Sequence, residues 1–147
     1  MATSAIPAAI NALITILDAV EDTDVFDGPP MTGENPDYIC VGHDPLDPLN
    51  AVEASQVPAS LGNRAREESF DILCSLAAWS GGGLISDRRA RALDMFAAIE
   101  AAVRANVTLN GTVRTAQIGT YTLVQEQTEQ GPSAGLRFRI ACSARLT

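Results

Sequence analysis

Apolar residues recur with the 3.6-residue period of an α-helix in two stretches of this chain. The first stretch begins near Thr3 or Ser4, either of which can cap a helix. Pro7 falls in its first turn, where the missing N–H costs nothing. Its apolar stripe consists of Ile6, Ala9, Ile10, Leu13, Ile14 and Leu17.

The second helical stretch, residues 86–106, is the longest element that the pattern predicts. Ser86 is expected to cap it and Asn106 to end it in the left-handed conformation. Its stripe consists of Leu93, Phe96, Ile99 and Val103, widened by Ala92, Met95 and Ala102. Because a sheet should pack on this stripe, aspartate at Leu93 or Phe96 is expected to unfold the protein by burying an unpaired charge.

Strict alternation predicts strands elsewhere. Residues 67–79 place one apolar set on a single face, namely Phe70, Ile72, Cys74, Leu76 and Ala78. The other face is polar at first and apolar at Ala77 and Trp79, so another chain is expected to cover that end. Residues 117–126 and 136–144 form a further alternating pair, and the polar segment 127–135 between them is expected to be a flexible hairpin tip.

Shorter strands are expected at residues 25–27 and 38–43, and a long loop at residues 44–63. That loop contains three prolines and no clear period, and loops of this length are usually functional or mobile. The predicted fold is α+β, an antiparallel or mixed sheet packed against two helices in the order α-(β)-β-loop-β-α-β-β. We expect residues 1–147 to form one domain.

Composition narrows the classes of function. The chain has a formal net charge of −8, and all ten of its basic residues are arginine, so it is a poor candidate for coating nucleic acid. Three cysteines at no metal spacing suggest buried free thiols in a reducing compartment. The apolar residues 5–20 are too few for a membrane span, and no basic segment precedes them, so neither a membrane protein nor a signal peptide is expected.

Candidate catalytic motifs have simpler explanations. Residues 81–83 are glycines before a helix, but the lysine and hydroxyl of a phosphate loop are missing. His43 lies among carboxylates but lacks the convergent ligands of a metal site. Asp94 or Glu100 could serve as the base of a hot-dog-fold enzyme, although the outer face of an amphipathic helix explains both. The sequence therefore predicts no enzyme, no cofactor and no metal.

Nearly the whole chain resembles the tail terminator (minor tail) proteins of long-tailed phages. The resemblance is carried by the segments AIPAAINALITILDAVEDTDVFDGPP, DYICVGHD, REESFDILCSLAAWSGG, DRRARALDMFAAIEAAV and LRFRIACSARLT. It implies a small α+β subunit of a hexameric ring on the head-proximal end of the tail tube. Such a ring stops tube polymerisation, meets the neck or head-completion protein, and lets DNA slide through an acidic lumen. The location that it implies is the virion tail, assembled in the host cytoplasm.

Interface residues are expected where opposite charges or aromatic side chains lie on outward faces. An acidic chain that associates with itself needs arginine to meet its carboxylates, and tryptophan is enriched in interfaces. The predicted subunit or tube interface consists of Trp79, Arg137, Arg139, Arg145, Asp47, Glu53 and Gln130. We expect the isolated protein to be a monomer or weak oligomer with residues 44–63 and 127–135 mobile. The alternatives are another neck or tail-completion adaptor of the same particle, and a hot-dog-like small-molecule enzyme.

Overall fold

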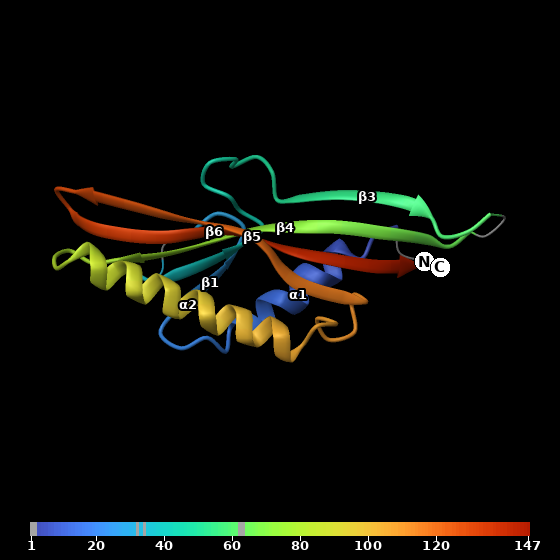
Figure 1. Cartoon of the computed structure of the whole chain (residues 1–147), viewed down its shortest axis with the longest axis horizontal. Helices are drawn as coiled ribbons and strands as arrows, with labels where there is room; N and C mark the ends of the chain where they lie inside the picture. The colour runs from blue at the N-terminus through green and yellow to red at the C-terminus, as the bar shows by residue number, and fades with distance from the viewer. Residues whose placement is uncertain (1–2, 32, 34, 62–63) are drawn as a thin grey trace.

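The computed structural model describes residues 3–31, 33, 35–61 and 64–147. Within these residues, two α-helices lie on the same face of a twisted six-stranded sheet (Figure 1). The elements are α1 (Ile6–Leu17), β1 (Asp24–Asp27), β2 (Tyr38–Val41), β3 (Val52–Pro58), β4 (Arg66–Trp79), α2 (Ile85–Ala105), β5 (Thr115–Thr128) and β6 (Gly131–Leu146). The predicted α+β class, with two helices on a mixed sheet, is confirmed.

Strand β4 is the axis of the sheet. One of its edges pairs with β6 over the whole strand, from Arg66↔Leu146 to Trp79↔Ser133. Its other edge carries β3 at one end and β2 at the other, so these two short strands follow each other along β4. On the outer side of β6, β5 pairs with β6 in antiparallel sense. On the outer side of β2, β1 pairs with β2 in parallel sense. Strands β1, β3 and β5 are therefore the edge strands of the described sheet.

The core lies between this sheet and the helices. The alternation predicted for β4 and β6 is confirmed, because the apolar set of each strand is buried on the helix side. The core members from β6 are Leu136, Phe138, Ile140, Cys142, Ala144 and Leu146, and those from α1 are Ala9, Ala12, Leu13 and Leu17. The predicted stripe of α1 is confirmed at Ala9, Leu13 and Leu17, while Ile6, Ile10 and Ile14 are partly buried beside it.

The loop predicted at residues 44–63 is wrong in its second half, where β3 pairs with β4 over seven residues. Val52 and Gln56 point to the helix side and Glu53 to the other, so polar and apolar residues share each face and the alternation is hidden. Pro48 precedes the strand and Pro58 is its last residue, so neither proline interrupts its pairing. Residues 62 and 63, the end of that predicted loop, lie outside the described residues.

The hairpin tip predicted at residues 127–135 is also too long. Pairing between β5 and β6 continues to Thr128↔Gly131, so the connection consists of residues 129 and 130. Gly131 has a φ of 119°, and a Cβ there would collide with the carbonyl oxygen of Ser80. Glycine thus lets the tip pack against the turn after β4.

A β-bulge between Ile118 and Tyr121 interrupts the alternation predicted for residues 117–126. Strict alternation would place Tyr121 on the face opposite Ile118, but the extra residue brings both to the helix side, since they pair with Phe138 and Ile140 respectively. The Tyr121 ring accordingly lies 5.0 Å from the ring of Phe96 in α2.

The predicted apolar stripe of α2 is confirmed at its buried positions and wrong at Leu93. The side chains that it buries are those of Ala92, Met95, Ile99 and Val103, while Phe96 is half-buried against Phe138. Leu93 remains 41% exposed, so its assignment to the core is wrong. Successive helical residues turn by about 100°, which carries Leu93 away from the arc that Ala92 and Met95 define. The predicted end at Asn106 is right in place but not in conformation, because its φ is −142°.

Among the described residues, no side chain caps the N-terminus of α2. The N-cap is Leu84, with extended φ and ψ of −103° and 142°, and not Ser86 as predicted. We expect Leu84→Asn to raise the free energy of unfolding by about 1 kcal/mol. The side-chain carbonyl oxygen of asparagine can accept a hydrogen bond from an N–H of the first helical turn that otherwise has no partner. The urea midpoint should rise accordingly, while Ser86→Ala should leave it nearly unchanged. An unchanged midpoint for Leu84→Asn would contradict this account of the cap.

Candidate interaction surface

The sheet face opposite the helices carries a row of arginines. Arg137, Arg139 and Arg145 alternate along β6 with the buried apolar set and point to this face. Across the ladder, β4 contributes Glu67 and Asp71 to the same face. We call this surface the open face, because no helix of the described chain covers it (Figure 1).

The pair Arg137–Asp44 fastens the segment after β2 onto the open face. Arg137 donates from Nε and Nη2 to the two oxygens of Asp44, at 2.6 and 2.7 Å. These bonds lower the pKa of Asp44 below its usual range although the residue is buried. Beneath the same segment, Ser75 donates to the carbonyl oxygen of His43 at 3.1 Å. This part of the open face is therefore covered by the chain itself.

The other two arginines are paired more loosely. Arg139 donates to Glu53 at 2.8 Å and lies 3.5 Å from Asp71. Arg145 lies 3.8 Å from Glu67. Such exposed pairs contribute only about 0–1 kcal/mol each. The carboxylates that the arginines were expected to meet in a neighbouring subunit are thus available within the chain, and the interface role of these arginines stays a prediction.

The remaining predicted interface residues lie apart from this row. Trp79 ends β4 beside the β5–β6 tip and is 42% exposed. Gln130 is in that tip, where its N–H donates to Oγ1 of Thr128 at 3.2 Å. Asp47 lies between β2 and β3 and accepts a bond from Asn50 at 2.7 Å. The structure therefore joins Arg139 with Glu53 and leaves Trp79 and Gln130 together at one end of the sheet.

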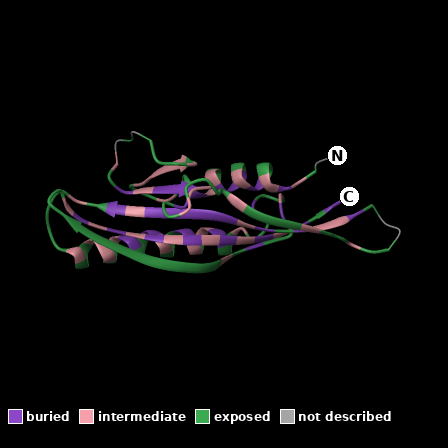
Figure 2. Ribbon diagram, turned by 90° about the horizontal axis from the view of Figure 1, so that it is seen from above, coloured by how far each residue is buried: buried purple, intermediate pink, exposed green. Residues whose placement is uncertain are grey.

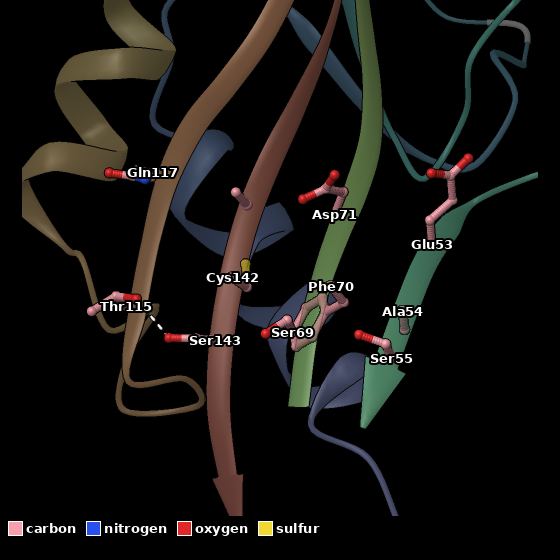
Figure 3. Close-up of a pocket in the computed structure, with 11 residues that line it drawn as sticks. Glu53, Ala54, Ser55, Ser69, Phe70, Asp71, Thr115, Gln117, Cys142 and Ser143 are labelled. Atoms are coloured by element: carbon pink, nitrogen blue, oxygen red, sulfur yellow. Dashed lines mark hydrogen bonds between the residues drawn. The ribbon is translucent and has the colours of Figure 1, made fainter. Parts of the chain in front are cut away.

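A trough of about 520 Å³ runs across the open face between β3 and β5 (Figure 3). Its floor and walls are lined by Glu53, Ala54, Ser55, Ser69, Phe70, Asp71, Thr115, Gln117, Ala141, Cys142 and Ser143. The hydroxyls of Thr115 and Ser143 bond each other at 2.7 Å, and no histidine or lysine is among the lining residues. The described residues also contain no group of three or more potential ligands that could hold a metal ion. We assign this trough no catalytic role.

The candidate enzyme residues are not assembled into a site by the contacts of the described chain. Asp94 is exposed in a hollow between α1 and α2 whose other lining residues include Ile16, Val20 and Met95. Glu100 forms an exposed ion pair with Arg104, one turn further along α2. His43 lies on the other side of the sheet, on the segment that covers Ser75.

A buried carboxylate that sequence reasoning missed joins the chain start to the sheet. Glu68 of β4 is 1% exposed and accepts three hydrogen bonds, from the Ser4 hydroxyl at 2.7 Å, the Ala5 N–H at 2.8 Å and the Gln56 amide at 3.1 Å. Burial raises its pKa, but the hydrogen bonds outweigh burial and leave the pKa below its usual range. The signal was visible in the sequence, since Glu68 lies two residues before Phe70 and therefore falls on the apolar face of β4.

The three cysteines are free and buried, as predicted. Burial raises the pKa of Cys40 to about 11 and that of Cys74 to about 12. Because the thiolate is the reactive form, these positions are packing residues of the core.

Large apolar side chains are exposed at both ends of β4. Leu61 follows β3 at one end and is fully exposed, while Leu84 and Trp79 lie at the other end, beside the β5–β6 tip. At about 3.3 Å per residue, β4 separates the two groups by about 40 Å. In the described part of the chain, neither helix has the length and apolar character needed to cross a membrane.

No family model matches the chain, and no curated protein matches it. Among solved structures, the chain is similar to one from the "Virion of native gene transfer agent (GTA) particle", with 15% sequence identity and a TM-score of 0.45. The match covers 97% of this chain and 100% of that chain.

Proposed function

We propose that this chain is a structural virion protein of the tail-terminator type. In this role it forms a ring of identical subunits, a hexamer by the resemblance, on the head-proximal end of a tail tube. The ring ends tube polymerisation and offers its other side to the neck or head-completion protein. The protein acts by binding and not by catalysis, within the assembled virion.

The observation that carries this proposal is the exposure of large apolar side chains at both ends of an elongated subunit (Figure 1). Apolar side chains that are exposed in a single subunit gain free energy when another protein covers them. A cap between a tube and a neck needs two such contact sites on opposite sides. Leu61 at one end and Leu84 with Trp79 at the other meet this requirement.

The electrostatics agree with a channel that DNA passes without binding. The formal net charge is −8, and the arginines of the open face each lie against a carboxylate of the same chain. Binding of DNA depends on unpaired cations that replace counterions along the phosphates. A ring of such subunits would repel the phosphate backbone and let it slide.

Deleting the protein from particles that carry it should give tails of excessive and variable length, because nothing then stops tube growth. Electron microscopy of the particles measures tail length directly. Tails of normal length without attached heads would instead identify a neck adaptor. Normal tails with heads would overturn both structural roles.

A matched pair of variants ties this test to the exposed apolar ends. Leu61→Asp should reproduce the overlong or headless tails, because a charge replaces an apolar contact. Ser60→Asp, at the neighbouring exposed position, adds the same charge and should leave the tails normal. Equal defects in the two variants would show that Leu61 is not the contact.

A further inference from the structure

A second hollow on the open face lies where β4 pairs with β2. It has a volume of about 230 Å³, mainly apolar walls, and Arg137 of the open face among its lining residues. One rung of paired residues crosses it, with one residue from each of four strands: Tyr38 (β2), Ala77 (β4), Gly135 (β6) and Val124 (β5). The two small residues form a floor between two larger side chains. We call this hollow the distal groove.

Apolar side chains that the chain leaves exposed surround the distal groove. Leu46, on the segment after β2, and Val124, on β5, line it, and both are exposed. Strand β5 is exposed along nearly its whole length (Figure 2). Trp79 lies two residues beyond Ala77, hence on the same face, and is exposed as well. Burying these side chains under another protein gains free energy, so the groove has the character of a contact site.

The shape of the distal groove suits an α-helix and not an added strand. Tyr38 and Val124 stand three strand spacings apart, about 14 Å, and a helix with its side chains is about 10–12 Å wide. Strands β4 and β6 beneath the groove are paired on both edges, so their backbones offer no hydrogen bonds to an incoming segment. An extended segment buried there would leave its own N–H and C=O groups without partners, whereas a helix pairs them internally.

Carboxylates outnumber cations around the distal groove. Glu126 lines it and forms no ion pair within the described residues. Arg137, the one cation among the described lining residues, is already held by both oxygens of Asp44. The bonds to Asp44 raise the pKa of Arg137, and the nearby charge of Asp47 raises it further. A partner with lysine or arginine beside its apolar residues would complement this charge.

A second copy of this chain does not supply such a helix. Both α1 and α2 bury their apolar stripes on the sheet of their own subunit. A helix can offer an apolar stripe to the distal groove only if that stripe is free. The partner is therefore a different protein.

We infer that the distal groove receives an amphipathic α-helix of a neighbouring virion protein. The apolar stripe of this helix lies over Ala77 and Gly135, and its basic residues face Glu126. The floor extends along β4 from Ser75 to Trp79, about 13 Å, which about nine helical residues cover. The inference deepens the proposed function, because it names the kind of segment that the Trp79 end of the subunit binds. It rests on that function for the partner being part of the virion.

Binding of model peptides tests the distal groove. The probe is a fluorescein-labelled, tryptophan-free peptide whose leucines recur with the period of a helix and whose other positions are alanine and lysine. A second peptide has the same composition in scrambled order, and a third has glutamate in place of lysine. Anisotropy measures the affinity of each peptide, and the emission of Trp79, the only tryptophan of the chain, reports whether the groove is covered. The lysine peptide should bind at least about tenfold more tightly than the other two and shift this emission to shorter wavelength.

Two pairs of variants locate the binding site. Ala77→Leu fills the floor of the groove, while Ala141→Leu adds the same side chain to the trough elsewhere on the open face. Affinity for the lysine peptide should fall at least about tenfold in the first variant and stay unchanged in the second. Glu126→Arg should weaken binding of the lysine peptide and strengthen binding of the glutamate peptide, because it reverses the charge at the rim. Asp18→Arg, at the end of α1, makes the same change of net charge away from the groove and should do neither.

The charge-reversal pair keeps the test decisive if Ala77→Leu fails to fold, because Glu126 and Asp18 are both exposed. No binding of the lysine peptide, or equally tight binding of its scrambled form, would overturn the inference. Equal weakening by Ala77→Leu and Ala141→Leu, or an unchanged peptide preference in Glu126→Arg, would do the same.

The groove and the proposed function fail in different ways. If the lysine peptide does not bind but tails are overlong without the protein, the groove inference is overturned and the terminator role stands. If tails are normal without the protein but the peptide binds at the groove, the terminator role is overturned and the groove remains a helix-binding surface.

Discussion

Replacing Met95 by aspartate is expected to unfold the protein. Met95 is fully buried between α2 and the sheet, in the same cluster as Ile99 and Phe138. Truncating such a methionine costs about 2–5 kcal/mol, and the carboxylate adds the cost of a buried charge without a partner. Since the whole free energy of unfolding of a domain is about 5–15 kcal/mol, most molecules should lose their native structure. The measurement is thermal and urea unfolding followed by circular dichroism.

Leu93→Asp is the matched control on the same helix. Because Leu93 is 41% exposed, its replacement should change the free energy of unfolding by less than about 1 kcal/mol and leave a cooperative transition. The sequence pattern predicted the opposite, with Leu93 in the core. A folded Met95→Asp together with an unfolded Leu93→Asp would show that α2 presents its other side to the sheet.

The error on α2 shows what periodicity can decide. Its length, its position and most of the side that it buries followed from the sequence, but Leu93 was wrongly placed in the core. The predicted stripe of Leu93, Phe96, Ile99 and Val103, widened by Ala92, Met95 and Ala102, was broader than the arc that the sheet buries. Within that stripe the sheet receives Ala92, whose small side chain allows close approach, with Met95 and Ile99 around it. Packing against this sheet thus decided which edge of the broad apolar stripe is buried.

The strands were predicted well where the two faces of a strand differ in polarity, and poorly where both faces mix polar and apolar residues. Strand β6 alternates apolar residues with arginines, so its faces were evident from the sequence. Strand β3 mixes polar and apolar residues on each face and is held as a strand by β4, a partner outside its own sequence. The bulge in β5 likewise depends on pairing with β6, so the inversion at Tyr121 could not be read from β5 alone.

The candidate surface was predicted in part for the same reason. The arginine row follows from alternation within one strand. The identity of its partners follows from the register of three strands, which brings Glu53 and Asp71 to Arg139. The open edge of β5 was not predicted, because the edge position of a strand depends on the order of the whole sheet.

The hydrogen-bonded Glu68 gives the second large effect. Glu68→Gln replaces a carboxylate that accepts three hydrogen bonds with an amide whose NH2 must face a donor. We expect this to lower the free energy of unfolding at pH 7 by about 1–3 kcal/mol. Glu67→Gln, on the adjacent open face, breaks only exposed pairs and should cost less than about 1 kcal/mol. Urea unfolding of the two variants measures the difference.

The pH dependence separates the charge of Glu68 from its shape. The folded-state pKa of Glu68 lies below its unfolded value, which is about 4.3, so the folded protein holds this proton less tightly. The stabilisation is therefore complete above the unfolded pKa and is lost as the pH falls through the folded pKa. In this acid range the free energy of unfolding of wild type should lose this contribution, whereas that of Glu68→Gln has no such contribution to lose. The difference in free energy of unfolding between the two proteins should therefore narrow. A gap that stays constant down to the acid range would mean that Glu68 acts by packing alone. A narrowing gap would show that the ionised carboxylate fastens the start of α1 to β4.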